Sequence, residues 1–417
     1  MIIDQIVFTF ISIWSLGFIF ILITQKGKHQ STKSSYPIKS STSPLVKIPD
    51  KCELIQLQLV ARHGTRNPTF GDIKKFDSLV EKLTNTQQNW SHPYHYSQAG
   101  LLVAKGEEEL YLLGKRSRSR YKKFWQNITY DPNIIKFQSS SVARTGQSGI
   151  AYSLGLFTGY GTLSLLKLQP IYVSFLPREL DTELSMHRSC PKWVSTLNKS
   201  KNKHKLEQEK NYLNFNVTSI SKHLSRKLNI QPPLEPKYLE HIYRICGYDI
   251  SLFDRSGKNI NNGDGDGNGS RWCNLLRNDD VLSLEYFNDI GYYFLYSYGN
   301  QLNTRLACRF FTGLVNEVEN LAFNKSKTKA VLRFAHAETI LFIITMLDLY
   351  KDGFSLNFNL TSDQVSLRKF KTSKIAPFGS NIYFEIYQSE FCAWNDFKKL
   401  LGNNIDCNFN ELCKLDK

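Results

Sequence analysis

The feature that most constrains how this chain folds is a strand-like run that ends in a cluster of charged side chains. In residues 53–61 (ELIQLQLVA) apolar side chains alternate with glutamines, a period of two that predicts a half-buried β-strand. Residues 62–68 (RHGTRNP) follow at once and hold two arginines and a histidine. Gly64 allows the backbone to approach a neighbour closely, and Pro68 ends the strand. The cluster is therefore predicted to lie at the carboxyl end of a strand.

The same pattern occurs at two more places in the chain. Residues 134–140 (IIKFQSS) are strand-like and lead into a capped helical segment that begins near Arg144. Residues 330–335 (AVLRFA) lead into an apolar helical segment, 336–350, whose first turn holds a histidine and a glutamate. In open α/β sheets, ligands bind beyond the carboxyl ends of strands, where helix N-termini also favour anions. The three strand ends thus predict one anion pocket, formed by Arg62, His63, Arg66, Arg144, His336 and Glu338.

Simpler interpretations of three of these side chains stay open at this point. A glutamate in the first turn stabilises the helix dipole in any case, and spacing alone favours this interpretation for Glu338. Arg144 could lie on the surface of a capped helix start. His63 could be a histidine whose ring is satisfied within a turn, although the glycine, proline and two arginines around it argue against this.

The composition is typical of a folded protein that binds anionic partners. Of the 417 residues, 41% are hydrophobic and 13% are aromatic, which excludes a largely disordered chain. The net charge of +16 favours anionic partners, although residues 25–51 alone carry six lysines against one aspartate. The basic run 115–125 (KRSRSRYKKFW) continues a helical pattern from residues 106–114. We therefore expect a solvated helix face there and no nucleic-acid partner.

Cysteines and glycosylation motifs indicate an oxidising compartment. The chain has eight cysteines, an even number, and no C-x-x-C pair, which argues against a structural zinc site. Together with repeated N-x-S/T motifs, the cysteines predict a secretory-pathway protein with an extracellular or lumenal catalytic domain. The candidate glycosylation sites are Asn89, Asn127, Asn198, Asn216, Asn268, Asn324 and Asn359.

Spacing alone does not determine how the cysteines pair. We expect a bond between Cys407 and Cys413 as a local clip. We also expect a bond between Cys246 and Cys273 across an Asn/Asp/Gly-rich insertion at residues 257–270.

Residues 1–46 differ from the rest of the chain and are predicted to form a hydrophobic segment and a polar stalk. Residues 5–24 contain 20 residues without a charge, long enough to span a bilayer as a helix. Their N-terminal position makes a signal peptide the competing interpretation. We expect either a cleaved signal or a retained membrane anchor. The Ser/Lys-rich stalk follows at residues 26–44.

At this point the motifs resemble those of a known family. RHGTRNP (62–68) resembles the RHGxRxP motif of histidine acid phosphatases. The distant HAE (336–338) resembles the His-Ala-Glu of the multiple inositol polyphosphate phosphatase branch, where most of the superfamily has His-Asp. Asn67 departs from the pattern, because that branch often has an aromatic residue there. Further similar segments extend the resemblance from about residue 50 to the C-terminus: HRSCPKW (187–193), RWCNLL (271–276) and residues 284–303.

The resemblance implies an α/β fold, namely a phosphoglycerate-mutase-like αβα sandwich with an inserted, mostly helical subdomain. The histidine phosphatase domain would comprise residues 47–417. Within it, the sheet core is expected at about residues 47–145 and 300–417, and the helical cap at about residues 146–299.

The resemblance also implies a chemistry for the predicted pocket. His63 would be the nucleophile and form a phosphohistidine. Arg62, Arg66 and Arg144 would hold the phosphate oxygens, and His336 would add a further donor. Glu338 would protonate the leaving alkoxide and then help to activate water. No metal or cofactor is expected, because the arginines supply the positive charge.

The function that the resemblance implies is hydrolysis of phosphomonoesters in inositol polyphosphates of the phytate type, with bisphosphoglycerate as a further candidate. The partner would be a polyanionic small molecule, and Arg178 and Lys192 are candidates to contact its remaining phosphates. A secreted or lysosomal acid phosphatase that acts on small phosphomonoesters is the alternative. A third hypothesis is a surface glycoprotein that binds such ligands without catalysis.

Overall fold

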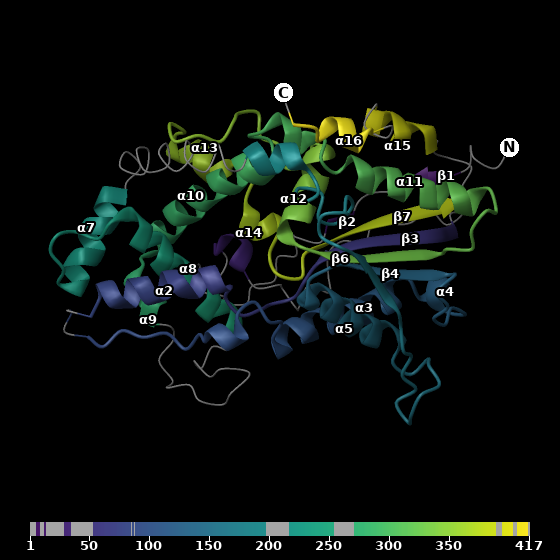
Figure 1. Ribbon diagram of the computed structural model, residues 1–417, viewed down its shortest axis with the longest axis horizontal. Coiled ribbons are helices and arrows are strands. Elements are labelled where there is room, and N and C mark those ends of the chain that lie inside the picture. Colours follow the sequence, from purple (N-terminus) through teal and green to yellow (C-terminus); the bar gives the residue numbers. More distant parts are fainter. Residues whose placement is uncertain are drawn as a thin grey trace.

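The computed structural model describes residues 6–8, 12–13, 29–34, 53–84, 86, 88–196, 217–253, 271–388, 394–402 and 407–415. Figure 1 shows a sheet with helices on both faces and a second, helical part beside it. The sheet domain therefore has the αβα layering that the resemblance implied.

The strands of the sheet are β1 (Ile6–Phe8), β2 (Ser12–Ile13), β3 (Glu53–Arg62), β4 (Ile135–Ser140), β5 (Val173–Leu176), β6 (Ala330–Ala335) and β7 (Asn381–Gln388). Their order is β1-β7-β3-β6-β4-β5, and β2 also pairs with β7. β6 runs parallel to both β3 and β4, and β5 runs parallel to β4. β7 runs antiparallel to β3. The carboxyl ends of β3, β6 and β4 therefore meet at one edge of the sheet.

Helices cover both faces of this sheet (Figure 1). One face carries α3 (Ala104–Arg120), α4 (Lys122–Trp125) and α5 (Ala143–Phe157). The other face carries α11 (Cys308–Ala322), α12 (Ala337–Met346), α15 (Trp394–Leu401) and α16 (Phe409–Leu412). The helical part contains α2 (Phe70–Lys82), α7 (Val217–Leu228), α8 (Pro236–Leu252), α9 (Arg271–Leu275) and α10 (Asn278–Tyr296). The remaining short helices are η2 (Ser31–Lys33), η3 (Tyr96–Gln98), η4 (Gln301–Thr304), α13 (Ser362–Leu367) and α14 (Thr372–Ile375).

The central strand β3 is buried on both faces, whereas its alternating pattern predicted burial on only one. Leu57 and Leu59 pack into the core beneath α3 and α5. Gln56 and Gln58, on the opposite face, are also fully buried. The amide of Gln58 donates to the carbonyl oxygen of Leu314 in α11 at 3.1 Å, and that of Gln56 donates to two further carbonyl oxygens. Because these amides are hydrogen-bonded, polar side chains can occupy a buried face.

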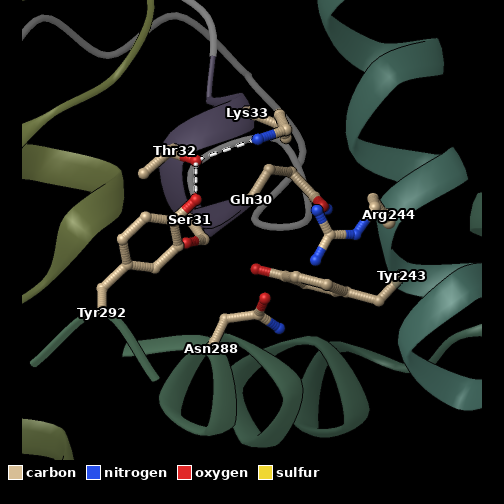
Figure 2. A pocket seen from close by; sticks show the side chains of 8 residues that line it. All are labelled: Gln30, Ser31, Thr32, Lys33, Tyr243, Arg244, Asn288 and Tyr292. Carbon is tan, nitrogen blue, oxygen red and sulfur yellow. Dashed lines mark hydrogen bonds between the residues drawn. The ribbon is translucent and has the colours of Figure 1, made fainter. Parts of the chain in front are cut away.

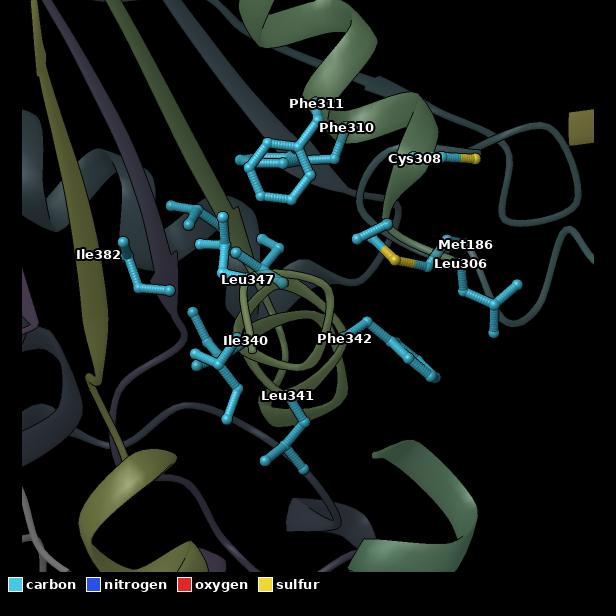
Figure 3. Close-up of a cluster of buried hydrophobic side chains, with 14 of the residues drawn as sticks. Met186, Leu306, Cys308, Phe310, Phe311, Ile340, Leu341, Phe342, Leu347 and Ile382 are labelled. Carbon is cyan, nitrogen blue, oxygen red and sulfur yellow. The ribbon is translucent and has the colours of Figure 1, made fainter. Parts of the chain in front are cut away.

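The helix that follows β6 lies deep in the largest core. Its side chains pack among aliphatic and aromatic neighbours from η4 and α11. The helix expected over residues 336–350 forms, although it ends at Met346. The first turn of α12 therefore has a rigid support. Figure 3 shows several of these buried side chains, including Ile340, Leu341, Phe342, Phe310 and Phe311.

The helical part has its own core, to which α2, α7, α8, α9 and α10 contribute. Helix α2 belongs to the expected sheet range 47–145, but it packs against α8. Strand β5 belongs to the expected cap range 146–299, but it pairs with β4 at the edge of the sheet. We keep the two-part division as a proposal, with α2 in the helical part and α5 and β5 in the sheet part.

Residues 29–34 pack inside the fold and do not belong to an extended stalk. Thr32 is 1% exposed, and its hydroxyl lies 2.9 Å from the hydroxyl of Tyr292. Ser31 is also buried with its hydroxyl hydrogen-bonded, so this polar segment is buried without losing its hydrogen bonds. The rest of the expected stalk, residues 26–44, lies outside the described residues.

Most of the hydrophobic segment 5–24 also lies outside the described residues. The expectation of a signal peptide or a membrane anchor therefore stays a prediction. Its two described pieces are β1 and β2, which pair with β7. Within the described ranges, no helix is both long enough and apolar enough to cross a membrane.

The pairing of Cys246 with Cys273 is confirmed, but the expected local clip between Cys407 and Cys413 is wrong. Helix α16 lies between these two cysteines, and their partners lie in separate segments, Cys308 at the start of α11 and Cys190 far earlier in the chain. Each cysteine therefore reaches a distant partner, with Cα atoms 5.7 Å apart for Cys407 and 4.8 Å apart for Cys413. The disulfides among the described residues are Cys190–Cys413, Cys246–Cys273 and Cys308–Cys407.

The described candidate glycosylation sites are all on the surface. The side chains of Asn89, Asn127, Asn324 and Asn359 are exposed, as an acceptor must be. Asn198, Asn216 and Asn268 lie outside the described residues. Glycosylation itself stays a prediction.

Helices α3 and α5 approach so closely that each needs a glycine at the contact. A Cβ atom on Gly155 would lie 1.9 Å from the carbonyl oxygen of Tyr111. A Cβ atom on Gly114 would lie 2.1 Å from the carbonyl oxygen of Tyr152. Since both obstacles are backbone atoms, no side-chain movement can relieve the clash.

We predict that Gly155→Ala lowers the free energy of unfolding by about 1–3 kcal/mol or more, because the two helices must move apart. Denaturant unfolding followed by circular dichroism measures this change. Gly71→Ala in α2 is the matched control, because no atom of the described residues lies within 4 Å of a Cβ atom there. Equal stability of the two variants would contradict the close contact between α3 and α5.

Candidate active site

The sheet brings the predicted residues to one edge. β3 pairs with β6 so that Arg62 lies opposite the last residue of β6. The residues that directly follow these two strands, His63 and His336, have ring centroids 5.5 Å apart. β4 flanks β6 on its other side and leads into α5, whose first turn holds Arg144. Glu338 lies in the first turn of α12. Residues from three separate strand ends thus face one another.

His63 is held as a neutral imidazole. Its Nδ1–H donates to the carbonyl oxygen of Gly64 at 2.8 Å, which leaves the lone pair on Nε2. Burial lowers the pKa of His63 well below its usual range, and the charges of Arg62 and Arg144 lower it further. At neutral pH the ring therefore presents a nucleophilic nitrogen.

The loop that carries His63 is fixed by a close backbone contact. A Cβ atom on Gly64 would lie 2.1 Å from the carbonyl oxygen of Gly106 at the start of α3, so this position needs glycine. The buried carboxylate of Glu109 accepts hydrogen bonds from the backbone and the hydroxyl of Thr65, both at 2.8 Å. The role of Glu109 escaped the sequence analysis, which assigned the segment around it only a helical pattern.

Arg62 is buried and is oriented by groups without a full charge. Its Nη1 donates to the carbonyl oxygens of Thr32 and Ala376, both at 2.6 Å. Its guanidinium lies 4.3 Å from the ring centroid of Phe378. Burial and the nearby Arg66 lower the pKa of Arg62 to about 10, so it stays charged at physiological pH.

Arg66 is held through a tyrosine. Its Nη1 donates to Tyr248 at 2.9 Å, and the Tyr248 hydroxyl donates to Asp72 at 2.9 Å. The same Nη1 donates to the carbonyl oxygen of Asn67 at 2.7 Å. The backbone of Asn67 thus has a role in the site, although its side chain has no explanation in the structure. Neither Tyr248 nor Asp72 carries a motif that would have marked it in the sequence.

The three arginines keep hydrogen-bonding capacity for a ligand. Among the residues that the structure describes, the buried Nε–H groups of Arg62, Arg66 and Arg144 have no acceptor. Burial, followed by the charge of Arg66, lowers the pKa of Arg144 to about 10. Buried donors without partners are unfavourable, and an anion would satisfy them.

His336 and Glu338 complete the site from α12. The Nε2 atom of His336 lies 2.9 Å from the hydroxyl of Ser140, at the end of β4, and burial lowers the pKa of His336 to about 3. Burial raises the pKa of Glu338, but His336, His187 and Arg62 outweigh this and lower it to about 2. The carboxyl group is therefore ionised in the ligand-free site. A bound phosphate would raise this pKa by adding negative charge.

His187 is a further residue near Glu338 for which the sequence analysis assigned no role. It is buried against the ring of Trp193, with centroids 5.0 Å apart, and its Nδ1 has no partner among the described residues. Burial lowers the pKa of His187 to about 4, whereas the nearby Glu338 raises it. Its place in the HRSCPKW segment was the only signal in the sequence.

Several known proteins are similar to this chain. The family model for the histidine phosphatase superfamily (branch 2) matches residues 53–400. Multiple inositol polyphosphate phosphatase 1 of Dictyostelium discoideum is 27% identical over 420 residues, which cover 85% of this chain and 63% of that protein. The protein of the same name from Homo sapiens is 24% identical over 368 residues, which cover 81% and 71%. The chain thus spans less than two thirds of the length of the Dictyostelium relative.

Two solved structures share the fold. The phytase from D. castellii has a TM-score of 0.68 at 17% identity, covering 93% of this chain and 87% of that one. The multiple inositol polyphosphate phosphatase of Bifidobacterium longum, in complex with inositol hexasulfate, has a TM-score of 0.59 at 14% identity, covering 86% and 88%. At these identities the likeness concerns the fold alone.

We predict that inorganic phosphate stabilises the protein against thermal unfolding, because it fills the anion pocket. At a phosphate concentration about 100 times Kd, the gain is about 2.7 kcal/mol. Arg144→Ala should lose most of this gain, which a thermal shift assay measures. Arg226→Ala in α7, an exposed arginine, is the matched control and should retain it. An undiminished phosphate shift in Arg144→Ala would exclude this arginine from the pocket.

We also predict that Glu338→Gln binds inorganic phosphate more tightly than the wild type at neutral pH. The substitution removes an ionised carboxylate beside the anion, a repulsion on the order of 1 kcal/mol or roughly fivefold in Kd. Isothermal titration calorimetry measures both affinities. Equal or weaker binding by the variant would contradict an ionised Glu338 that faces the anion.

Proposed function

Because the chain belongs to branch 2 of the histidine phosphatase superfamily, we propose that it hydrolyses phosphomonoesters of inositol polyphosphates through a phosphohistidine. The observation that carries this proposal is a neutral histidine beside three arginines. Among the described residues, nothing accepts from the buried Nε–H groups of these arginines. A relative that bears the name of multiple inositol polyphosphate phosphatase supports the substrate class. A relative named phytase A, from Neurospora crassa, supports it as well.

In the first step, Nε2 of His63 attacks phosphorus while the bond to the alkoxide oxygen breaks. The guanidinium groups of Arg62, Arg66 and Arg144 stabilise the charge on the phosphate oxygens. His336, oriented by Ser140, supplies a further donor. These charges assist throughout the transfer because they are buried and fixed in place.

Glu338 acts first as the general acid and then as the general base. The bound phosphate raises its pKa, so the carboxyl group is protonated in the complex and donates its proton to the leaving alkoxide. In the second step, the resulting carboxylate takes a proton from water, which attacks phosphorus. The bond between phosphorus and His63 breaks, inorganic phosphate forms, and the neutral imidazole returns.

A general acid phosphatase with small monoester substrates is the second candidate. Two relatives from Schizosaccharomyces pombe support it: a thiamine-repressible acid phosphatase is 24% identical, and an acid phosphatase is 25% identical. Bisphosphoglycerate is a further substrate candidate. A panel of inositol hexakisphosphate, bisphosphoglycerate and p-nitrophenyl phosphate separates these substrate classes.

The compartment is part of the same proposal. The three disulfides within the described ranges and the exposed sequons are expected of a secreted or lumenal enzyme. Residues 5–24 would direct the chain there as a signal peptide or a membrane anchor.

We predict that purified protein releases phosphate from inositol hexakisphosphate and that His63→Ala abolishes this release. Glu338→Gln should lower kcat by about 10²- to 10⁴-fold, because an alkoxide is a poor leaving group without a proton donor. His95→Ala, an exposed histidine before η3, is the matched control and should keep full activity. Acid-labile labelling by a radioactive phosphomonoester should detect the phosphoenzyme. Full turnover by His63→Ala would refute the mechanism.

A further inference from the structure

A small pocket adjoins the anion site on the side of the N-terminal segment. Figure 2 shows the η2 turn as one wall, with side chains from α8 and α10 opposite. The carbonyl oxygen of Thr32 in this wall is an acceptor for Arg62, so the pocket and the anion site share a boundary. The lining residues are Gln30, Ser31, Thr32, Lys33, Tyr243, Arg244, Asn288 and Tyr292.

The η2 turn is held in place from several sides. The Ser31 hydroxyl lies 2.7 Å from that of Thr372 in α14, and the Thr32 hydroxyl lies 2.9 Å from that of Tyr292 in α10. The Nδ1 atom of His29 lies 2.8 Å from the carboxylate of Glu285. These contacts fix the backbone before Lys33, and the carbonyl oxygen of Ser34, which accepts from the backbone of Phe378 at 3.2 Å, fixes it after Lys33. Lys33 itself is partly exposed and lines the pocket.

In the part of the chain that the structure describes, no carboxylate forms an ion pair with Lys33. Its ammonium donates to the Thr32 hydroxyl at 3.1 Å. Burial, Arg66 and Arg244 lower the pKa of Lys33 well below its usual range, while Asp72 acts in the opposite direction. The charges around this ammonium are therefore mostly of its own sign.

The carboxylates nearby are already engaged. Asp72 accepts from Tyr248 at 2.9 Å and pairs with Arg244 at 3.2 Å. Glu240 also pairs with Arg244. Arg244 is thus paired with two acids, whereas no carboxylate among the described residues pairs with Lys33. An anion bound here would pair with Lys33 and favour the protonated form of its amine.

We propose that Lys33 forms a second anion subsite that holds a phosphate other than the one transferred to His63. This inference rests on the proposed function. The ammonium of Lys33 lies 5.7 Å from the ring centroid of Tyr248, and the guanidinium of Arg66 lies 5.8 Å from the same centroid. Both groups therefore lie within 6 Å of one ring centroid, close enough for one polyphosphorylated molecule to reach both. A lysine suits this role because it binds phosphate as a compact point charge.

The subsite gives the N-terminal segment a part in substrate selection. A ligand with a single phosphate uses the three arginines alone, whereas a polyphosphate gains the additional contact with Lys33. Arg178, which we had considered for such a contact from the sequence, is exposed.

The test compares binding of inositol hexakisphosphate and inorganic phosphate by isothermal titration calorimetry, with His63→Ala as the background so that no turnover occurs. Adding Lys33→Met should weaken binding of inositol hexakisphosphate by roughly 10- to 100-fold, the value of a charge-assisted hydrogen bond. This loss should exceed the loss for inorganic phosphate by at least about tenfold. Lys33→Arg should restore most of the affinity, and Lys325→Met, an exposed lysine, controls for net charge.

Equal losses for the two ligands, or no loss for either, would overturn the proposal. Thermal unfolding identifies any misfolded variant, and Lys33→Gln, which keeps a polar side chain, then takes the place of Lys33→Met. The test is independent of the reaction mechanism. Full activity of His63→Ala would contradict the proposed chemistry, and inositol hexasulfate, an analogue without phosphate esters, would then replace inositol hexakisphosphate in this binding comparison.

Discussion

Repulsion between buried cations is the constraint on which the rest of the structure depends. Arg62, Arg66 and Arg144 lie so close together that the charge of Arg66 lowers the pKa of both others. On a protein surface, water and salt would weaken this repulsion, but the helices around the site exclude most of the solvent. The fold must therefore supply contacts that hold these charges together in the absence of a ligand.

The contacts that hold the arginines do so without cancelling their charge. Arg62 is oriented by two carbonyl oxygens and the face of an aromatic ring. None of these groups carries a net charge, so the positive charge of Arg62 is not cancelled. Arg66 reaches a carboxylate only through the hydroxyl of Tyr248. A direct carboxylate partner on Arg62 would have stabilised the empty protein and competed with an incoming phosphate. The site is thus preorganised for an anion, and this arrangement lowers the stability of the ligand-free protein.

The sequence predicted those parts of the fold and the site that depend on local patterns. The strand ends at Arg62, Ser140 and Ala335 follow from short alternating or apolar runs, each followed by a helix start. Burial of Gln56 and Gln58 could not be predicted, because it depends on carbonyl groups more than 250 residues away. The same holds for the tyrosine behind Arg66 and for two of the disulfides, which join positions 99 and 223 residues apart. The η2 turn resembled a linker because most partners of its side chains lie in distant helices.

The position of the η2 turn has a consequence for how the protein is made. Residues 29–34 leave the ribosome early, whereas their partners in α8, α10 and α14 follow more than 200 residues later. The acceptor that orients Arg62 therefore cannot be in place until most of the chain has been synthesised. A nascent chain would carry the RHGTRNP motif long before it carried a working site. The proposed hydrolysis of phosphate esters would thus begin only after the domain has closed around residues 29–34.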